Sequence, residues 1–186
     1  IALDDRTLAE LYYPPFCAAL AAGSHSVMTA YNSVGGRPAT QNSQLLTETL
    51  RKAWGFRGFV ITDAAATGGA TVLHHTASTT RAAARQAFVA GVDVIFQSAA
   101  VTDSAVARVL RTKAAIGLFA DPYGNPDSAA YWNGHPTHRA LAREAAAAAM
   151  VLLRNTGTLP LDASVPSVAL IGADAAEARL GGYTAP

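Results

Sequence analysis

The sequence predicts an α/β protein assembled from repeated βα units with parallel strands. Apolar, strand-like runs recur around Val27, Val60 and Val92, which lie 33 and 32 residues apart, close to the ~30-residue length of a βαβ unit. Each interval carries a helical pattern of apolar residues. The run Phe59-Val60-Ile61 is apolar without alternation, which is typical of a strand buried on both faces of a parallel sheet. This pattern fits part of a (β/α) barrel or a doubly wound sheet.

The first segment predicts a helix in two pieces, followed by a strand. Thr7 and Glu10 have the Ser/Thr-x-x-Glu spacing of a capping box. Pro14-Pro15 is expected to interrupt this helix, because proline lacks the N–H that the preceding turn needs. A short helix then restarts and ends at Gly23, and the first strand is expected over residues 26–31.

The next elements follow from capping residues and glycine stops. Asn42 or Ser43 caps a helix that Gly55 closes, and Thr79 or Thr80 caps a later one. We expect helices over about 43–54, 80–90 and 102–116, and strands over 58–63 and 92–96.

The pattern changes after residue 118. Residues 119–164 are rich in Pro, Gly and Asn at first, which predicts a linker, and then carry a connecting helix capped near Thr137. Residues 165–186 begin a second unit with a strand over Ser167–Gly172, too short a segment to bury a core of its own. We therefore expect the chain to be a fragment of a longer protein.

Composition argues against several classes of partner. The chain has 14 basic and 13 acidic residues and a formal net charge of +1, which argues against nucleic acid or an anionic membrane surface. The longest apolar run, residues 145–153, is well short of the ~20 residues of a transmembrane helix. Cys17 is the one cysteine, and the pairs His74-His75 and His135/His138 fall outside the predicted strand ends. We expect no metal and no cofactor.

Asp63 is the strongest candidate for chemistry, because it ends the most apolar strand. In barrel enzymes the catalytic residues lie at the C-terminal ends of the strands. Asp63 could act there as a nucleophile or a general base, or it could simply cap the following segment. Tyr31 lies at the equivalent end of the previous strand, three residues after Met28. Its phenol could bind a carboxylate or a substrate hydroxyl, or it could fill the rim of a barrel.

Six stretches occur in a fixed order along the chain. They are TLAELYYPPF, VMTAYNSVGGRPATQNSQLLTETLR, WGFRGFVITDA, KAAIGLFADPY, AREAAAAAMVLLRNTGTLPL, and VALIGADA followed by LGGY. Together they resemble glycoside hydrolase family 3, the family of β-glucosidases and β-xylosidases. The resemblance implies the C-terminal half of a TIM-like (β/α) barrel over residues 1–118, the linker and connecting helix over 119–164, and the first strand of an incomplete α/β sandwich domain over 165–186.

The resemblance also implies an activity. Asp63 matches the nucleophile of a retaining β-glycosidase that removes terminal β-D-glucosyl or β-D-xylosyl residues through a covalent glycosyl-aspartate, and Met28 and Tyr31 match residues that line the subsite of the cleaved sugar. The substrate would be a β-linked oligosaccharide or an aryl glycoside. A retaining mechanism also needs an acid/base carboxyl group, which the resemblance places in the second domain, beyond this chain. We therefore expect the missing barrel half and the second domain as intramolecular partners, and no activity from the chain alone.

One residue departs from the family pattern. The position after the nucleophile is commonly Trp or another bulky residue, whereas this chain has Ala64. The smaller side chain is expected to widen the sugar subsite. Because of this difference and the missing partners, a non-catalytic carbohydrate-binding or structural remnant of such an enzyme is the alternative function.

Overall fold

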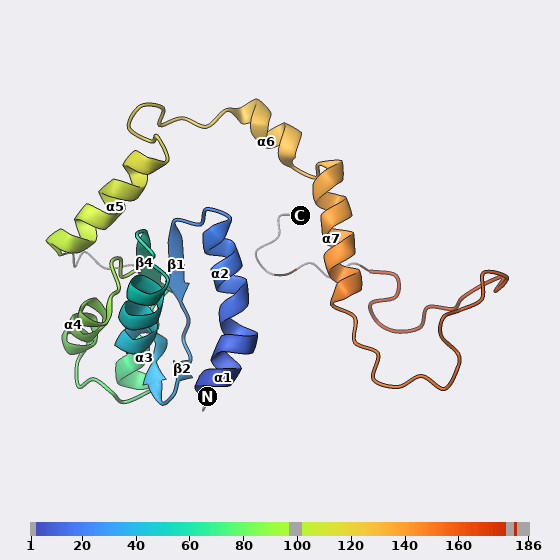
Figure 1. Cartoon of the computed structure of the whole chain (residues 1–186), viewed down its shortest axis with the longest axis horizontal. Coiled ribbons are helices and arrows are strands. Elements are labelled where there is room, and N and C mark those ends of the chain that lie inside the picture. The colour runs from blue at the N-terminus through green and yellow to red at the C-terminus, as the bar shows by residue number, and fades with distance from the viewer. Residues whose placement is uncertain (1–2, 97–101, 178–180, 182–186) are drawn as a thin grey trace. The chain divides into compact units, whose positions relative to one another are not determined.

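The computed structural model describes residues 3–96, 102–177 and 181. The chain divides into two compact units, residues 1–125 and 126–186 (Figure 1). The first unit is a mixed α/β structure, and the candidate site lies within it. Residues 178–180 and 182–186, part of the segment 165–186 expected to begin a second domain, lie outside the described residues.

The N-terminal helix passes through its two prolines without a break. Helix α1 (Asp5–Thr7) continues into the π-helical turn η1 (Leu8–Tyr12) and then into α2 (Tyr13–Ala21). The predicted interruption is therefore wrong. Pro14 and Pro15 are the second and third residues of α2 and directly follow the π-helical turn, in which the N–H of Tyr13 donates to the carbonyl oxygen of Leu8. Each proline removes only its own N–H from the helical hydrogen bonds, and the helix continues on those of the neighbouring residues. Gly23 ends the helix in a left-handed conformation, as predicted.

The first two predicted strands, over residues 26–31 and 58–63, are parallel neighbours. Strand β1 (Ser26–Thr29) pairs with β4 (Phe59–Thr62) in a parallel register that matches Val27 with Val60. Figure 1 shows these two strands side by side, with α2 flanking β1. The third predicted strand, residues 92–96, is reduced to one parallel bridge between Val94 and Ile61.

A short hairpin follows β1 that the sequence pattern did not reveal. Strands β2 (Ser33–Val34) and β3 (Arg37–Pro38) pair in the antiparallel sense across Gly35-Gly36. Both glycines have positive φ, 60° and 77°, the conformation that a tight type I′ hairpin turn requires.

Helices connect the strands, as the βα pattern predicts. Thr79 and Thr102 cap α4 and α5, each accepting a backbone N–H three residues ahead, which confirms both predicted helix starts. Helix α3, directly after β4, was not expected. The helical elements of this part are η2 (Ala39–Gln41), η3 (Gln44–Ala53, wound as a π-helix), α3 (Ala66–Val72), α4 (Thr80–Ala90) and α5 (Asp103–Ala115).

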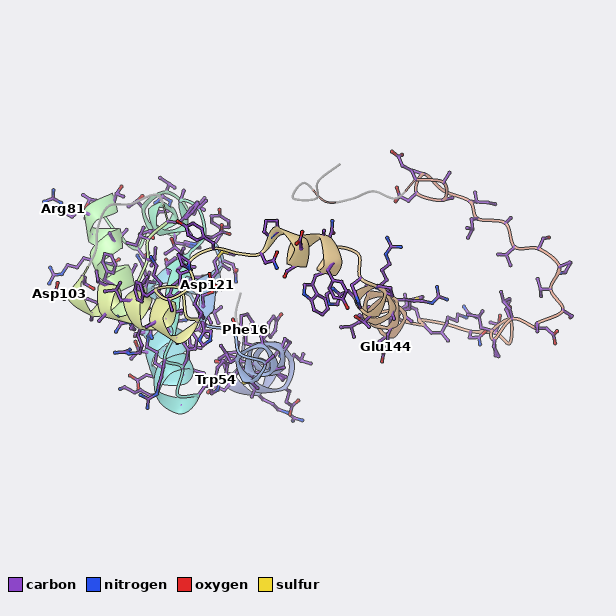
Figure 2. The ribbon with its side chains drawn as sticks, turned by 90° about the horizontal axis from the view of Figure 1, so that it is seen from above. Phe16, Trp54, Arg81, Asp103, Asp121 and Glu144 are labelled. Carbon is purple, nitrogen blue, oxygen red and sulfur yellow. The ribbon has the colours of Figure 1, made fainter. Side chains whose placement is uncertain are left out.

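The core lies on one face of the β1–β4 pair. Its buried members are Leu46, Leu50, Val60, Ala87, Ala90, Val92 and Ile95. They come from η3, β4, α4 and the segment after α4, so burial of these apolar side chains joins consecutive βα units. Phe16 of α2 and Trp54, both labelled in Figure 2, line an apolar cavity of about 280 Å³ beside β1, which Leu46 and Leu50 of the core also line.

The second unit contains helices and no strand in its described part. Helices α6 (Pro126–Trp132) and α7 (Pro136–Ala148) are followed by irregular chain. Residues 167–172 are exposed and form no strand, contrary to the prediction. A strand is completed by hydrogen bonds to a neighbour, and the described residues of this unit offer none. Within the described ranges, no helix combines the length and apolar character needed to cross a membrane.

Candidate active site

Asp63 directly follows the last residue of β4. Its backbone N–H donates to the carbonyl oxygen of Thr29 at 3.2 Å, which extends the pairing of β4 with β1 by one residue. Its carboxylate Oδ1 accepts the backbone N–H of Ala64 at 2.7 Å. The N-cap of α3 is Ala65, without a side-chain cap. The carboxylate of Asp63 therefore does not cap the following helix, and the half-buried side chain lies at the carboxyl end of the strand pair.

Tyr31 contacts the peptide next to Asp63. Its hydroxyl donates to the carbonyl oxygen of Ala64 at 2.6 Å, so the loops after β1 and β4 meet. Ala64 thus binds Asp63 through its N–H and Tyr31 through its carbonyl. The side chain of Tyr31 is 47% exposed, and it is therefore held more by hydrogen bonding than by burial.

Met28 shares a face with Asp63. Thr29 and Thr62 are register partners at the ends of β1 and β4, and both are buried. Because successive side chains of a strand point to opposite faces, Met28 and its partner Ile61 lie on the other face, and continuing the alternation by two residues places Asp63 there too. Met28 is 59% exposed. The structure thus brings all three predicted site residues to one end of the strand pair, with Tyr31 in direct contact with the peptide after Asp63.

A buried ionic network fixes the strand that carries Asp63. Asp93 is 2% exposed, and its carboxylate binds the guanidinium groups of Arg51 and Arg108. The same carboxylate accepts the backbone N–H of Val60, in β4, at 2.8 Å. Burial lowers the pKa of Arg51, against the opposing effect of the Asp93 charge. A buried charge persists when it is paired and hydrogen-bonded, so Asp93 ties η3, β4 and α5 together.

The sequence reasoning missed two contributors to this region. Asp93 interrupts the apolar run Val-Asp-Val-Ile-Phe, and an acidic residue in such a strand is the signal that could have indicated a buried ion pair. His74 lies with its Nε2 2.8 Å from the carbonyl oxygen of Tyr31. Among the described residues, no group of three or more His, Cys, Asp or Glu side chains is arranged to hold a metal ion.

Known proteins are similar to this chain in sequence. Residues 1–116 match the family model described as the glycosyl hydrolase family 3 N terminal domain. The periplasmic β-glucosidase of Salmonella typhimurium is 37% identical over 199 residues, covering 94% of this chain and 26% of that protein. The β-xylosidase of Formosa agariphila is 32% identical over 217 residues, covering 98% of this chain and 30% of that protein.

The fold has counterparts among solved structures. The crystal structure of a β-glucosidase from Listeria innocua in complex with gluconolactone matches with a TM-score of 0.65 and 34% identity, covering 87% of this chain and 25% of that chain. The present chain thus spans between 25% and 30% of the length of these three proteins. With the family model matched over residues 1–116 and relatives aligned along nearly the whole chain, the protein belongs to glycosyl hydrolase family 3.

Proposed function

We propose that this chain supplies the nucleophile and part of the sugar subsite of a retaining β-glycosidase. The substrates are terminal β-D-glucosyl or β-D-xylosyl residues of oligosaccharides or aryl glycosides. One observation carries the proposal: Asp63 lies at the carboxyl end of a parallel strand, with Oδ1 oriented by the N–H of Ala64 and with Tyr31 bound to the next carbonyl. The names of the relatives, β-glucosidases and β-xylosidases, support the choice of sugars.

The chemistry follows a double displacement at the anomeric carbon. A carboxylate oxygen of Asp63 attacks that carbon while the glycosidic bond breaks, and a second carboxyl group gives its proton to the leaving oxygen. The product is a glycosyl ester of Asp63. The second group then takes a proton from water, the water oxygen bonds to the same carbon, and the ester bond breaks. The sugar is released with its original configuration.

The second carboxyl group is assigned to a part of the enzyme outside this chain. The parallel β1–β4 pair and the Ile61–Val94 bridge fit consecutive strands of a (β/α) barrel. The exposed Met28 lies on the face that the remaining strands of such a barrel would cover. On this proposal the acid/base and the remaining strands of the barrel lie outside residues 1–186, so the isolated chain should show no turnover of nitrophenyl β-glucosides or β-xylosides.

The test uses the product of the gene that contains residues 1–186, hereafter the gene product. It should hydrolyse a nitrophenyl β-glucoside or β-xyloside, and a 2-deoxy-2-fluoro glycoside should label it at Asp63 in a peptide map. Asp63→Ala should lower kcat and kcat/KM together by several orders of magnitude, because the variant lacks a group that bonds to substrate in the transition state. Asp121→Asn, a change to an exposed acid in the same unit, serves as the matched control and should leave both constants unchanged.

Two results would contradict the proposal. Labelling of another carboxylate would remove the nucleophile role from Asp63. Sugar binding by the gene product without any hydrolysis or labelling would instead favour the non-catalytic carbohydrate-binding alternative.

A further inference from the structure

His74 lies on a loop whose backbone is fixed on both sides. The N–H groups of Leu73 and His74 both donate to the carbonyl oxygen of Gly69, at 2.9 and 3.0 Å, at the end of α3. The N–H of Thr76 donates to the carbonyl oxygen of Ala70 at 2.8 Å. The imidazole of His74 therefore projects from a segment that is anchored to α3 before and after it.

A ring of polar side chains anchors the same loop further along. The Thr76 hydroxyl donates to Gln41 Oε1 at 2.7 Å, and Gln41 Nε2 donates to Gln86 Oε1 at 2.7 Å. Gln86 Nε2 donates to the carbonyl oxygen of Thr76 at 3.4 Å, which closes the ring. These contacts hold the loop against η2 and α4, so the position of His74 does not depend on its own side-chain bond.

The imidazole reaches across to the loop after β1. His74 Nε2 lies 2.8 Å from the carbonyl oxygen of Tyr31, 43 residues away in the sequence. A carbonyl oxygen can only accept, so Nε2 must carry the proton in this contact. Both the neutral Nε2–H tautomer and the imidazolium satisfy that requirement.

Tyr31 is consequently held at its backbone and at its hydroxyl by residues on the two sides of α3. Its backbone carbonyl accepts from His74, after α3, and its hydroxyl donates to the carbonyl of Ala64, before α3. The N–H of Ala64 in turn orients the carboxylate of Asp63. A continuous path of hydrogen bonds therefore runs from His74 through Tyr31 and Ala64 to Asp63.

We propose that His74 is a positioning residue of the candidate active site, acting through Tyr31 on the geometry of Asp63. This inference rests on the proposed glycosidase function. Attack requires the reacting oxygen to approach the anomeric carbon in an aligned geometry at about 3–3.5 Å. Without the His74 bond, the exposed Tyr31 loses the hydrogen bond to its backbone carbonyl, and the hydroxyl that binds the carbonyl of Ala64 is held less firmly.

The experiment first compares three variants of the gene product with the wild type. His74→Ala should lower kcat about 10- to 100-fold with little change in KM, because a misplaced catalytic group affects the transition state more than ground-state binding. His74→Gln should recover most of this loss, since its side-chain amide can also donate to the carbonyl of Tyr31. His75→Asn is the matched control. His75 is exposed and has a φ of 52°, which asparagine tolerates, so this variant should keep the wild-type kcat.

A double-mutant cycle tests the path itself. Tyr31→Phe removes the hydroxyl bond to Ala64, so His74→Ala should cost less kcat in the Tyr31→Phe background than in the wild type. Thermal unfolding of all variants separates positioning from loss of fold, and we expect His74→Ala and His75→Asn to unfold at the same temperature.

The outcomes distinguish the two proposals. An active wild type labelled at Asp63, with an unaffected His74→Ala variant or with additive effects in the cycle, would overturn the positioning role alone. A loss of kcat that follows a lowered unfolding temperature would overturn it as well. A wild type that neither hydrolyses glycosides nor is labelled would overturn the proposed function, and with it this inference.

Discussion

The carboxylate of Asp93 accepts the backbone N–H of Val60 at 2.8 Å, so a buried charge on one segment holds the neighbouring strand β4 in place. The backbone reinforces this contact, because the N–H groups of Asp93 and Val94 both donate to the carbonyl oxygen of Val60. Asp63 lies three residues after Val60, directly beyond the end of β4. The position of the candidate nucleophile thus depends on a network outside the site.

Asp93→Asn should lower the free energy of unfolding by about 3–5 kcal/mol, because it leaves the guanidinium groups of Arg51 and Arg108 without a buried counter-charge. Urea-induced unfolding of the gene product measures this loss. Glu48→Gln is the control. It breaks an exposed pair with Lys52 on one helix, which should change stability by less than about 0.5 kcal/mol. Equal effects of the two substitutions would contradict a structural role for the buried network.

Gly58 and Gly68 should respond to alanine in opposite directions. A Cβ on Gly58 would lie 2.1 Å from the carbonyl oxygen of His25, so Gly58→Ala must displace the start of β4 and should destabilise by about 1–3 kcal/mol. Gly68 lies inside α3 with nothing within 4 Å of an added Cβ. Gly68→Ala should stabilise by about 0.5–1 kcal/mol, because alanine is the better helix former. Chemical denaturation of both variants checks the sign, and a tolerated Gly58→Ala would show that β1 and β4 pack less closely than described.

Ala65 adopts a left-handed conformation with a φ of 57° immediately before α3. Such a conformation costs an L-residue about 1–2 kcal/mol, so Ala65→Gly should raise stability, by up to about 1 kcal/mol once the greater freedom of unfolded glycine is included. The neighbouring Ala66→Gly provides the contrast. Ala66 is the first residue of the helix, and its replacement should destabilise. The two unfolding midpoints should shift in opposite directions, and a shared decrease would rule out strain at Ala65.

Asp4 should make the start of the first helix sensitive to acid. The hydrogen bonds that Thr7 gives to the carboxylate lower the pKa of Asp4 below its usual 3.8. A lowered folded-state pKa means that this stabilisation is present above pH 3.8 and is lost as the pH falls through the lower folded value. The amide NMR resonance of Thr7 should therefore titrate with a midpoint below 3.8. In Asp4→Asn, which keeps a capping oxygen but cannot ionise, the resonance should not titrate in this range. A midpoint above 3.8 would contradict the capping contact.

Local physical chemistry explains the parts of the fold that the sequence predicted. The helix starts at Thr79 and Thr102 depend on a side chain and an amide three residues ahead, and such spacings are readable in any sequence. The parallel pairing of β1 with β4 followed from the ~30-residue repeat of apolar runs. The same pattern predicted Asp63 as a candidate catalytic residue, because it is a carboxylate at the end of an apolar strand.

Contacts between distant residues account for what the pattern missed. Asp93 reaches Arg51 and Arg108, which are 42 and 15 residues away, and the sequence around Asp93 does not indicate either partner. The local pattern of residues 167–172 favours a strand, yet a strand forms only beside a neighbour that satisfies its backbone.

The candidate site likewise combines residues that the sequence indicated with contacts that only the structure shows. The sequence indicated Met28, Tyr31 and Asp63 as candidate site residues. It did not indicate the hydrogen bonds from His74 to Tyr31 and from Tyr31 to Ala64, which join residues 43 and 33 positions apart. The periodicity of apolar residues and the capping of helices depend on residues close together in the sequence, so the sequence alone reveals them. Which distant donor meets which acceptor is settled by packing, because only the folded backbone brings the two groups within hydrogen-bonding distance.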